Sequence, residues 1–358
     1  MATEQATGGS PRRTARWLDD RTRLGPVLAA MLHVRIPMTA RTFYFGGIAL
    51  FLFGIQVVTG TLLALYYKPT PEAAYESVQF ITSDVSFGWL IRSLHHWAAN
   101  LMILFVVLHL LRVFFQAAYK FPREVTWVVG CGLLLLTLGF GFTGYLLPWD
   151  QRAYWATVVG TEIAGGVPVI GDSLLLLLRG GSDVSGATMS RFFGIHVLVL
   201  PLALGGLLAA HLVLVHQLGL ANPKKPEPRV RTAEADDEPL RPFFPHYILD
   251  EVVAWYVLLA VLVVLASLYP AGLEEPANIL DAGHPKPEWY YLAVYEMLKF
   301  LPKDIGILAP IVGLGVVIVW PFLDRSPEVL ARRRKVVVGG ATLIVLALVF
   351  LTWRGYVA

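Results

Sequence analysis

The sequence predicts an all-α integral membrane protein, with seven transmembrane helices arranged as a four-helix bundle and a three-helix C-terminal part. Only 15% of its 358 residues are charged and 56% are hydrophobic, whereas a soluble domain carries about 25% charged residues. So few charges cannot cover a folded chain in water, and lipid is therefore the expected solvent. A bilayer core of about 30 Å requires about 20 apolar residues in a helix, and seven stretches reach that length.

The seven predicted spans follow one another at 43–66, 94–115, 126–147, 192–217, 252–269, 305–323 and 336–353. An amphipathic stretch at 160–190 lies outside the bilayer core. The polar, proline-rich stretch at 221–246 predicts a loose linker between the two helical parts. The predicted organisation is a cytoplasmic segment with an interfacial amphipathic helix (1–42), the four-helix bundle (43–218), the linker (219–246) and the three-helix part (247–358).

Basic residues set the predicted orientation, because cytoplasmic loops of membrane proteins are rich in Lys and Arg. The side that holds the N-terminus collects 20 of the 29 Lys and Arg residues. We therefore expect a bacterial cytoplasmic (inner) membrane protein with its N-terminus in the cytoplasm and its C-terminus on the outer, periplasmic side. The net charge of +3 gives no indication of nucleic acid binding. The single cysteine, Cys131, excludes an internal disulfide, a zinc cluster and a Cys-ligated iron–sulfur centre.

Four histidines lie inside two predicted spans that run in the same direction. His95 and His109 are 14 residues apart, which is close to four helical turns and about 21 Å. His196 and His211 are 15 residues apart, and Pro201 is expected to help absorb the small extra rotation. One histidine in an apolar helix is more often a packing residue, but two matched pairs predict two haem irons, each with two axial imidazoles.

Two glycine pairs repeat the spacing of the histidines. Gly46 and Gly60 in the first span, and Gly130 and Gly144 in the third, are also 14 residues apart. Glycine lets a flat macrocycle approach the backbone closely, although single glycines are also common in membrane helices for packing. Together with the histidines, these glycines predict a four-helix bundle that binds haem at two depths.

Two arginines lie three residues outside the histidines of the second span. Arg92 and Arg112 could pair with the anionic haem propionates at the two interfaces. The alternative is that they only extend to the membrane surface, as long basic side chains do. His96 faces about 100° away from its neighbour His95, so we do not count it as a ligand.

This histidine spacing, together with GYLLPWDQ at 144–151 and PEWY at 287–290, resembles cytochrome b of the Rieske/cytochrome b (cytochrome bc) complexes. Length and span count resemble a plastid-type cytochrome b fused through 221–246 to its usually separate subunit IV. The resemblance implies a catalytic, quinol-oxidising electron-transfer subunit of a quinol:cytochrome c oxidoreductase that operates a proton-translocating Q-cycle. Implied partners are a Rieske iron–sulfur protein, a cytochrome c-type subunit, quinone, lipid and a second copy of the chain in a homodimer.

The resemblance also implies the cofactors and the outer pocket. His95 and His196 would hold an outer haem b of lower potential, and His109 and His211 an inner haem b of higher potential. Glu288 would accept a proton from quinol, with Tyr295 in the same pocket, although a lone Glu in a loop is more often an ordinary interfacial carboxylate. The pocket would be completed by Tyr145, Pro287, Trp289 and Tyr290.

Two departures from the plastid pattern change the expectations. The start of the first span, RTFYFGG, has no cysteine, so no covalent c-type haem is predicted. His216 stands where the plastid type has an arginine, which resembles the respiratory type and implies an inner quinone site. Asp250 or Glu251 is a possible proton partner there. Two further residues are placed near this site by position alone, His33 and Arg41.

Three other readings remain open from the sequence. A di-haem b membrane anchor of another quinone-linked oxidoreductase also uses histidine ligands in a helical bundle, but it has no place for PEWY or the three-helix extension. A transporter could relay protons through intramembrane histidines, and it would bind no chromophore. A structural scaffold would leave the matched histidines and glycines unexplained.

Overall fold

The computed structural model describes residues 11–23, 25, 35–37, 44–221, 240–281 and 286–357. Within these residues the chain is mostly helical, and seven helical stretches are long and apolar enough to cross a membrane. They are α3 (Phe45–Ala64), α5 (Gly88–Phe115), α6 (Glu124–Tyr145), α9–η2–α10 (Gly186–Leu218), η3–α11 (Phe243–Leu268), α13 (Lys303–Leu323) and α14 (Lys335–Val357). The predicted all-α fold and its seven spans are confirmed. The second and fourth stretches each begin six residues earlier than predicted, and the fifth begins nine residues earlier, because the helices continue beyond their apolar parts.

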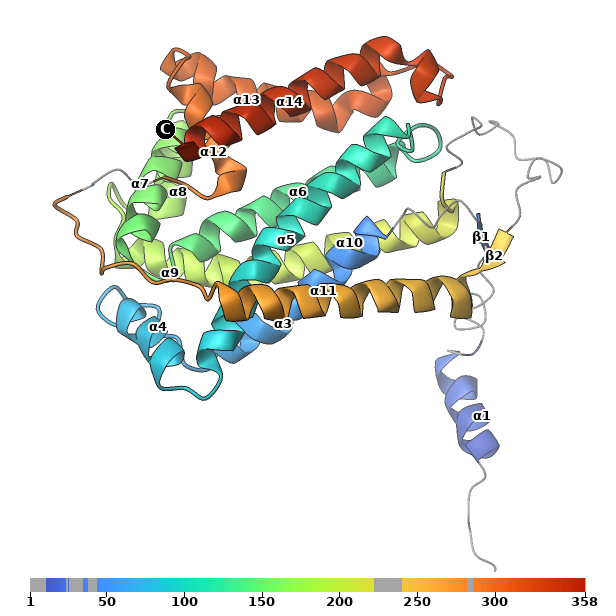
Figure 1. Ribbon diagram of the computed structural model, residues 1–358, viewed down its shortest axis with the longest axis horizontal. Helices are drawn as coiled ribbons and strands as arrows, with labels where there is room; N and C mark the ends of the chain where they lie inside the picture. Colours follow the sequence, from blue (N-terminus) through green and yellow to red (C-terminus); the bar gives the residue numbers. More distant parts are fainter. Residues whose placement is uncertain are drawn as a thin grey trace, which may run out of the picture.

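The remaining elements are short and lie mainly at the ends of the long helices. They are α1 (Pro11–Thr22), α4 (Ala74–Ser83), α7 (Gln151–Gly165), α8 (Gly171–Arg179), α12 (Trp289–Leu298), a 3-10 turn, η4 (Ala331–Arg333), and the antiparallel strands β1 (Arg35–Pro37) and β2 (Leu240–Pro242). Helices α4, α7, α8 and α12 gather at one end of the molecule, which we call the PEWY end (Figure 1). The strands lie at the opposite end, which we call the strand end.

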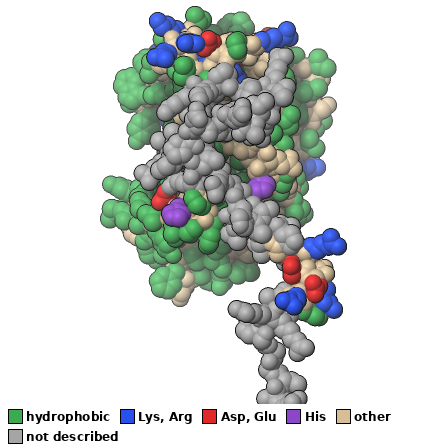
Figure 2. Space-filling view, turned by 90° about the vertical axis from the view of Figure 1, so that its right-hand side faces the viewer, with side chains coloured by type: hydrophobic (Ala, Val, Ile, Leu, Met, Phe, Trp, Pro, Cys, Tyr) green, Lys and Arg blue, Asp and Glu red, His purple; other side chains and the backbone are tan. Residues whose placement is uncertain are grey.

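The C-terminal helices pack on two sides of the bundle. Helix α11 lies against α3 and α5, whereas α13 lies against α6. The core between α3, α5, α10 and α11 is formed by Leu52, Ala98, Met102, Leu204, Leu258 and Leu262. Viewed from the strand end, the flanks of the molecule are green with hydrophobic side chains, and Lys and Arg gather at the top edge and again at the lower right (Figure 2). This distribution fits a chain whose sides face lipid.

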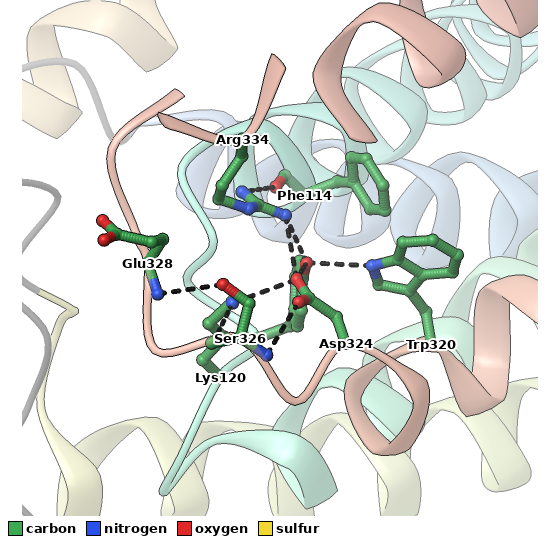
Figure 3. Close-up of polar contacts among 8 residues, drawn as sticks. Phe114, Lys120, Trp320, Asp324, Ser326, Glu328 and Arg334 are labelled. Atoms are coloured by element: carbon green, nitrogen blue, oxygen red, sulfur yellow. Dashed lines mark hydrogen bonds and ion pairs between the residues drawn. The ribbon is translucent and has the colours of Figure 1, made fainter. Parts of the chain in front are cut away.

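A buried polar cluster joins the two parts of the chain at the strand end (Figure 3). The Tyr119 hydroxyl donates to Asp324 Oδ2 at 2.5 Å and accepts from Trp320 Nε1 at 2.9 Å. Lys120 Nζ and Arg334 Nη2 lie 3.0 Å and 3.2 Å from the same carboxylate oxygen. Burial alone would raise the pKa of Asp324, but these hydrogen bonds and positive charges outweigh it and hold the pKa below its usual value. The cluster therefore ties the α5–α6 loop to the α13–α14 connection.

Candidate functional site

The structure brings His95 and His196 together at the PEWY end of the bundle. Their ring centroids are 6.4 Å apart, and the rings lie nearly edge to face. When two imidazoles bind the same metal ion from opposite sides, each at about 2 Å, their ring centroids are roughly 6 Å apart. The separation therefore fits one metal ion held between the two rings. Toward the strand end, His109 and His211 also lie within electrostatic range of one another.

The extra residue between His196 and His211 is absorbed by a change in helix type. Residues Ile195–Val199 form a π-helical turn, η2, that leads directly into α10 (Leu200–Leu218). A π turn takes one residue more than an α turn, so a step of 15 residues here corresponds to 14 elsewhere. The sequence predicts a contribution from Pro201, which follows the turn. The turn itself makes the adjustment, at the position of a proposed ligand.

Each of the four glycines faces one of the four histidines. We measured the distance from a Cβ atom added to each glycine to Cε1 of the histidine that it faces. This distance is 2.5 Å for Gly144–His196, 3.1 Å for Gly60–His95, 3.3 Å for Gly46–His109 and 3.4 Å for Gly130–His211. Cβ atoms in proteins essentially never come within 3.0 Å of another atom. We call these four residues the cradle glycines. The sequence predicts that they make room for a macrocycle, and in the structure the room they leave is taken by the edge of an imidazole.

Two threonines that the sequence analysis missed contact the histidines at the PEWY end. Thr59 Oγ1 lies 2.9 Å from His95 Nδ1, and Thr143 Oγ1 lies 3.1 Å from His196 Nδ1. His196 also faces the backbone carbonyl of Phe140. A signal for both threonines is present in the sequence, because each directly precedes a cradle glycine in a Thr–Gly pair.

The histidines nearer the strand end have a different environment. Nδ1 of His109 and Nδ1 of His211 are buried, and in the described part of the chain neither forms a hydrogen bond. His211 faces the backbone carbonyl of Thr126 without a formed bond. The two histidine levels therefore share the glycine cradle and differ in the hydroxyl groups around them.

The two arginines of α5 contact protein groups. Arg92 donates to the carbonyl oxygens of Ala271 at 2.7 Å and Gly272 at 2.5 Å. Arg112 Nε donates to Gln116 Oε1 at 3.1 Å. Arg92 thus fixes the loop that follows α11, and a propionate role for either arginine stays a prediction.

The PEWY residues line a half-buried region between α6, α7 and α12. Glu288 precedes α12, and burial raises the pKa of its carboxyl group, while the positive charge of Arg152 partly opposes this shift. The hydroxyl of Tyr145 is buried, within electrostatic range of Glu288, and has no hydrogen-bond partner among the described residues. The Tyr290 side chain lies against Gly141, where an added Cβ would be 2.9 Å from its hydroxyl. An orphaned hydroxyl beside a proton-binding carboxyl group suits a ligand that carries hydroxyl groups.

Trp289 and Pro287 belong to the same region in different ways. Trp289 Nε1 donates to Asn100 Oδ1 of α5 at 2.7 Å, which ties the PEWY segment to the helix that holds His95. Asn100 in turn lies 3.5 Å from the ring of His96. Pro287 is partly buried beside Glu288.

Tyr295 lies two helical turns beyond Glu288 and belongs to a different set of contacts. Lys299 Nζ lies 4.8 Å from the centroid of the Tyr295 ring. Next to it, the Glu296 side chain is only 1% exposed. Its two oxygens lie 2.7 Å from Lys299 Nζ and 3.0 Å from Arg354 Nε of α14. The sequence analysis did not find this ion-paired group, because Arg354 is far away along the chain.

At the strand end the structure brings together part of the predicted inner site. The Tyr44 hydroxyl donates to Asp250 Oδ2 at 3.1 Å. The Glu251 carboxylate lies directly against Gly47, where an added Cβ would overlap its Oε1 atom. His216 is exposed at the end of α10, and within the described ranges no hydrogen bond or ion pair links it to either carboxylate. The positions suggested for His33 and Arg41 lie outside the described residues.

Comparison with known proteins agrees with this arrangement. Residues 32–219 match the family described as cytochrome b/b6/petB, and residues 276–358 match cytochrome b(C-terminal)/b6/petD. A cytochrome bc complex cytochrome b subunit from Chlorobaculum thiosulfatiphilum is 41% identical over 87% of this chain and 74% of its own. The menaquinol:cytochrome c reductase cytochrome b subunit of Bacillus subtilis is 44% identical over 58% of this chain and 96% of its own.

A solved structure supports the same relationship over almost the whole chain. A chain of a hyperthermophilic respiratory complex III superposes with a TM-score of 0.85 at 33% identity, covering 96% of this chain and 91% of its own. The matched histidines, the cradle glycines and the PEWY segment all lie within the matching regions. The chain therefore belongs to the cytochrome b/b6 family, whose members are the cytochrome b subunits of cytochrome bc complexes.

Proposed function

We propose that this chain is the catalytic, quinol-oxidising subunit of a proton-translocating quinol:cytochrome c oxidoreductase and holds two haems b. The observation that carries the proposal is the pairing of His95 with His196 at 6.4 Å, each against a glycine that leaves room for its ring. His109 and His211 would hold the second haem in the same way. When bound, the two haems would supply one-electron steps between the two membrane faces. The haem nearer the PEWY end would have the lower potential.

The protein side of quinol oxidation would be carried out at the PEWY end. The unpaired Tyr145 hydroxyl and the Glu288 carboxylate would bind the quinol hydroxyls, and Glu288 would accept a proton. Its raised pKa suits this role, because the group can then bind and release a proton closer to neutral pH. Trp289, held by Asn100, would fix the position of Glu288. We place Tyr295 at the far edge of the pocket, where Lys299 orients its ring.

Quinone reduction would take place at the strand end. Asp250 and Glu251, together with the exposed His216, would deliver protons there, and no covalent c-type haem is expected. The implied partners are a Rieske iron–sulfur protein, a cytochrome c-type subunit, lipid and a second copy of this chain. We place the chain in a bacterial inner membrane with the strand end toward the cytoplasm. The domain limits 1–42, 43–218, 219–246 and 247–358 are part of the proposal.

A haem count tests the proposal directly. A pyridine haemochrome assay on the purified chain should give two haems b and no haem c per polypeptide, and a reduced-minus-oxidised spectrum should show b-type bands. The variant His95→Leu should keep one haem and remain inserted in the membrane. A colourless wild-type chain, or a His95→Leu chain with both haems, would refute the assignment. A transporter reading predicts the colourless result.

A further inference from the structure

Thr59 and Thr143 occupy equivalent places on the two helices that flank the histidines. Each lies one residue before a cradle glycine, Thr59 in α3 and Thr143 in α6, and both are almost fully buried. Their hydroxyl oxygens lie 2.9 Å and 3.1 Å from Nδ1 of His95 and His196, respectively. Both proposed ligands of the outer haem therefore contact a threonine hydroxyl at Nδ1, which leaves Nε2 as the nitrogen that would bind the iron.

The direction of these hydrogen bonds follows from the number of hydrogens available. Thr59 Oγ1 donates to the carbonyl oxygen of Ile55 at 2.7 Å, and a hydroxyl group has only one hydrogen to donate. Toward His95 it can therefore only accept, so the proton must sit on Nδ1 of the imidazole. Thr143 uses its hydrogen in the same way, on a carbonyl 2.8 Å away and one turn earlier in α6, and so accepts from His196. In both rings Nε2 keeps its lone pair for a metal ion.

The inner level has no such hydroxyl. Phe45 and Val129 precede the cradle glycines Gly46 and Gly130, each 14 residues before its outer counterpart. Both side chains are apolar, and Nδ1 of the inner histidines forms no hydrogen bond within the described chain. The hydroxyl pair is therefore a chemical difference between the two levels that lies directly next to the ligands.

We propose that Thr59 and Thr143 are positioning residues that lower the reduction potential of the outer haem relative to the inner haem. A histidine that donates its second N–H to an acceptor becomes a more basic metal ligand. A more basic ligand stabilises ferric over ferrous iron, and second-shell hydrogen bonds of this kind tune haem potentials. The donation from each threonine to a backbone carbonyl polarises the hydroxyl further. This inference rests on the proposed function and names the residues that make the outer haem the stronger reductant.

The test is a potentiometric titration of the purified complex, followed by its visible haem bands. Thr59→Val and Thr143→Val remove the acceptor with little change in shape and should each raise the outer midpoint potential while the inner one stays in place. An effect of up to about tenfold on the one-electron equilibrium constant corresponds to about 59 mV. Serine at either position keeps the hydroxyl and should keep the wild-type midpoint.

Matched controls come from the same helices. Thr61 in α3 and Thr137 in α6 also donate to a carbonyl one turn earlier, at 2.7 Å and 2.8 Å, and among the described residues neither hydroxyl forms a hydrogen bond with a histidine. Thr61→Val and Thr137→Val should leave both midpoints unchanged. A shift in these controls equal to the shift in Thr143→Val would overturn the proposal.

A reciprocal variant tests the same physics at the inner level. Val129→Thr places a hydroxyl one residue before Gly130, where it can accept from His211, and should lower the inner midpoint. If a valine variant loses the outer haem, the inner midpoint of Val129→Thr becomes the deciding measurement. An unchanged inner midpoint in that variant overturns the proposal. If the wild-type chain shows two b-type midpoints and the outer midpoint does not move in either valine variant, only this inference is refuted. A wild-type chain without two b-type midpoints refutes the proposed function.

Discussion

Substitution of the cradle glycines by alanine should damage haem binding most where the structure leaves the least space for a Cβ atom. At Gly144 the new Cβ would lie 2.5 Å from His196 Cε1, and ordinary contact begins at 3.4 Å. The imidazole or the helix must therefore move by about 0.9 Å. Overpacking of this kind costs about 1–3 kcal/mol, and about 1.4 kcal/mol changes an equilibrium constant tenfold. We expect Gly144→Ala to weaken outer haem binding by about 5- to 150-fold.

The opposite expectation holds where the histidine is already at contact distance. At Gly130 the added Cβ would lie 3.4 Å from His211 Cε1, and at Gly54 of α3 nothing lies within 4 Å. Gly130→Ala should therefore change inner haem affinity little, and Gly54→Ala should raise helix stability by about 1 kcal/mol. Haem titration of the purified apo-variants, followed by difference spectra, measures the affinities, and thermal unfolding measures the stability. Equal haem loss in Gly130→Ala and Gly144→Ala, or full affinity in Gly144→Ala, would refute the reasoning.

Three further outcomes are expected. Burial raises the pKa of Glu288 above the ordinary value of about 4.3. The rate of wild-type quinol oxidation should therefore rise with pH, through a range above that value, as the carboxylate forms. Glu288→Gln should oxidise quinol more slowly and lack this rise, with its haem content intact. Asp324→Asn leaves two buried cations without their carboxylate, at a cost of about 3–5 kcal/mol. In a chain cleaved within 221–246, it should therefore lower the temperature at which the two fragments dissociate. Glu328→Gln, at an exposed ion pair, is the control and should leave that temperature unchanged. Glu296→Gln should loosen α12 and raise KM for quinol, whereas an unchanged KM with normal haem spectra would show that this buried carboxylate does not position the pocket.

Much of the bundle can be predicted from the sequence because it depends on periodicity. Nearly equal histidine spacing in two spans that run in the same direction predicts that His95 lies level with His196, and the glycines repeat the 14-residue step. The predicted starts of the second and fourth spans lie after the true helix starts at Gly88 and Gly186, since hydropathy marks the lipid boundary and a helix does not end there. The π turn that absorbs the extra residue lies just before Pro201, and it could not be predicted because a π turn has no clear sequence signature.

The parts that could not be predicted depend on contacts across the fold. Thr59 and Thr143 resemble ordinary helical threonines that bond to their own backbone, and only the three-dimensional structure shows the imidazole on their other side. Glu296 reads as one more charge in an amphipathic stretch until α14 brings Arg354 to it. The separation of Tyr295 from Glu288 is also a matter of tertiary placement.

The π turn at Ile195–Val199 also bears on how this helix could change during evolution. A turn of five residues in place of four is a site where one amino acid can be lost without rotating the ligand-bearing face, because the shortened helix would return to a regular α-helical repeat. His196 and His211 would then be 14 residues apart, as His95 and His109 already are. A deletion inside a membrane helix normally rotates every residue that follows it, and we expect this position to accept one without that rotation.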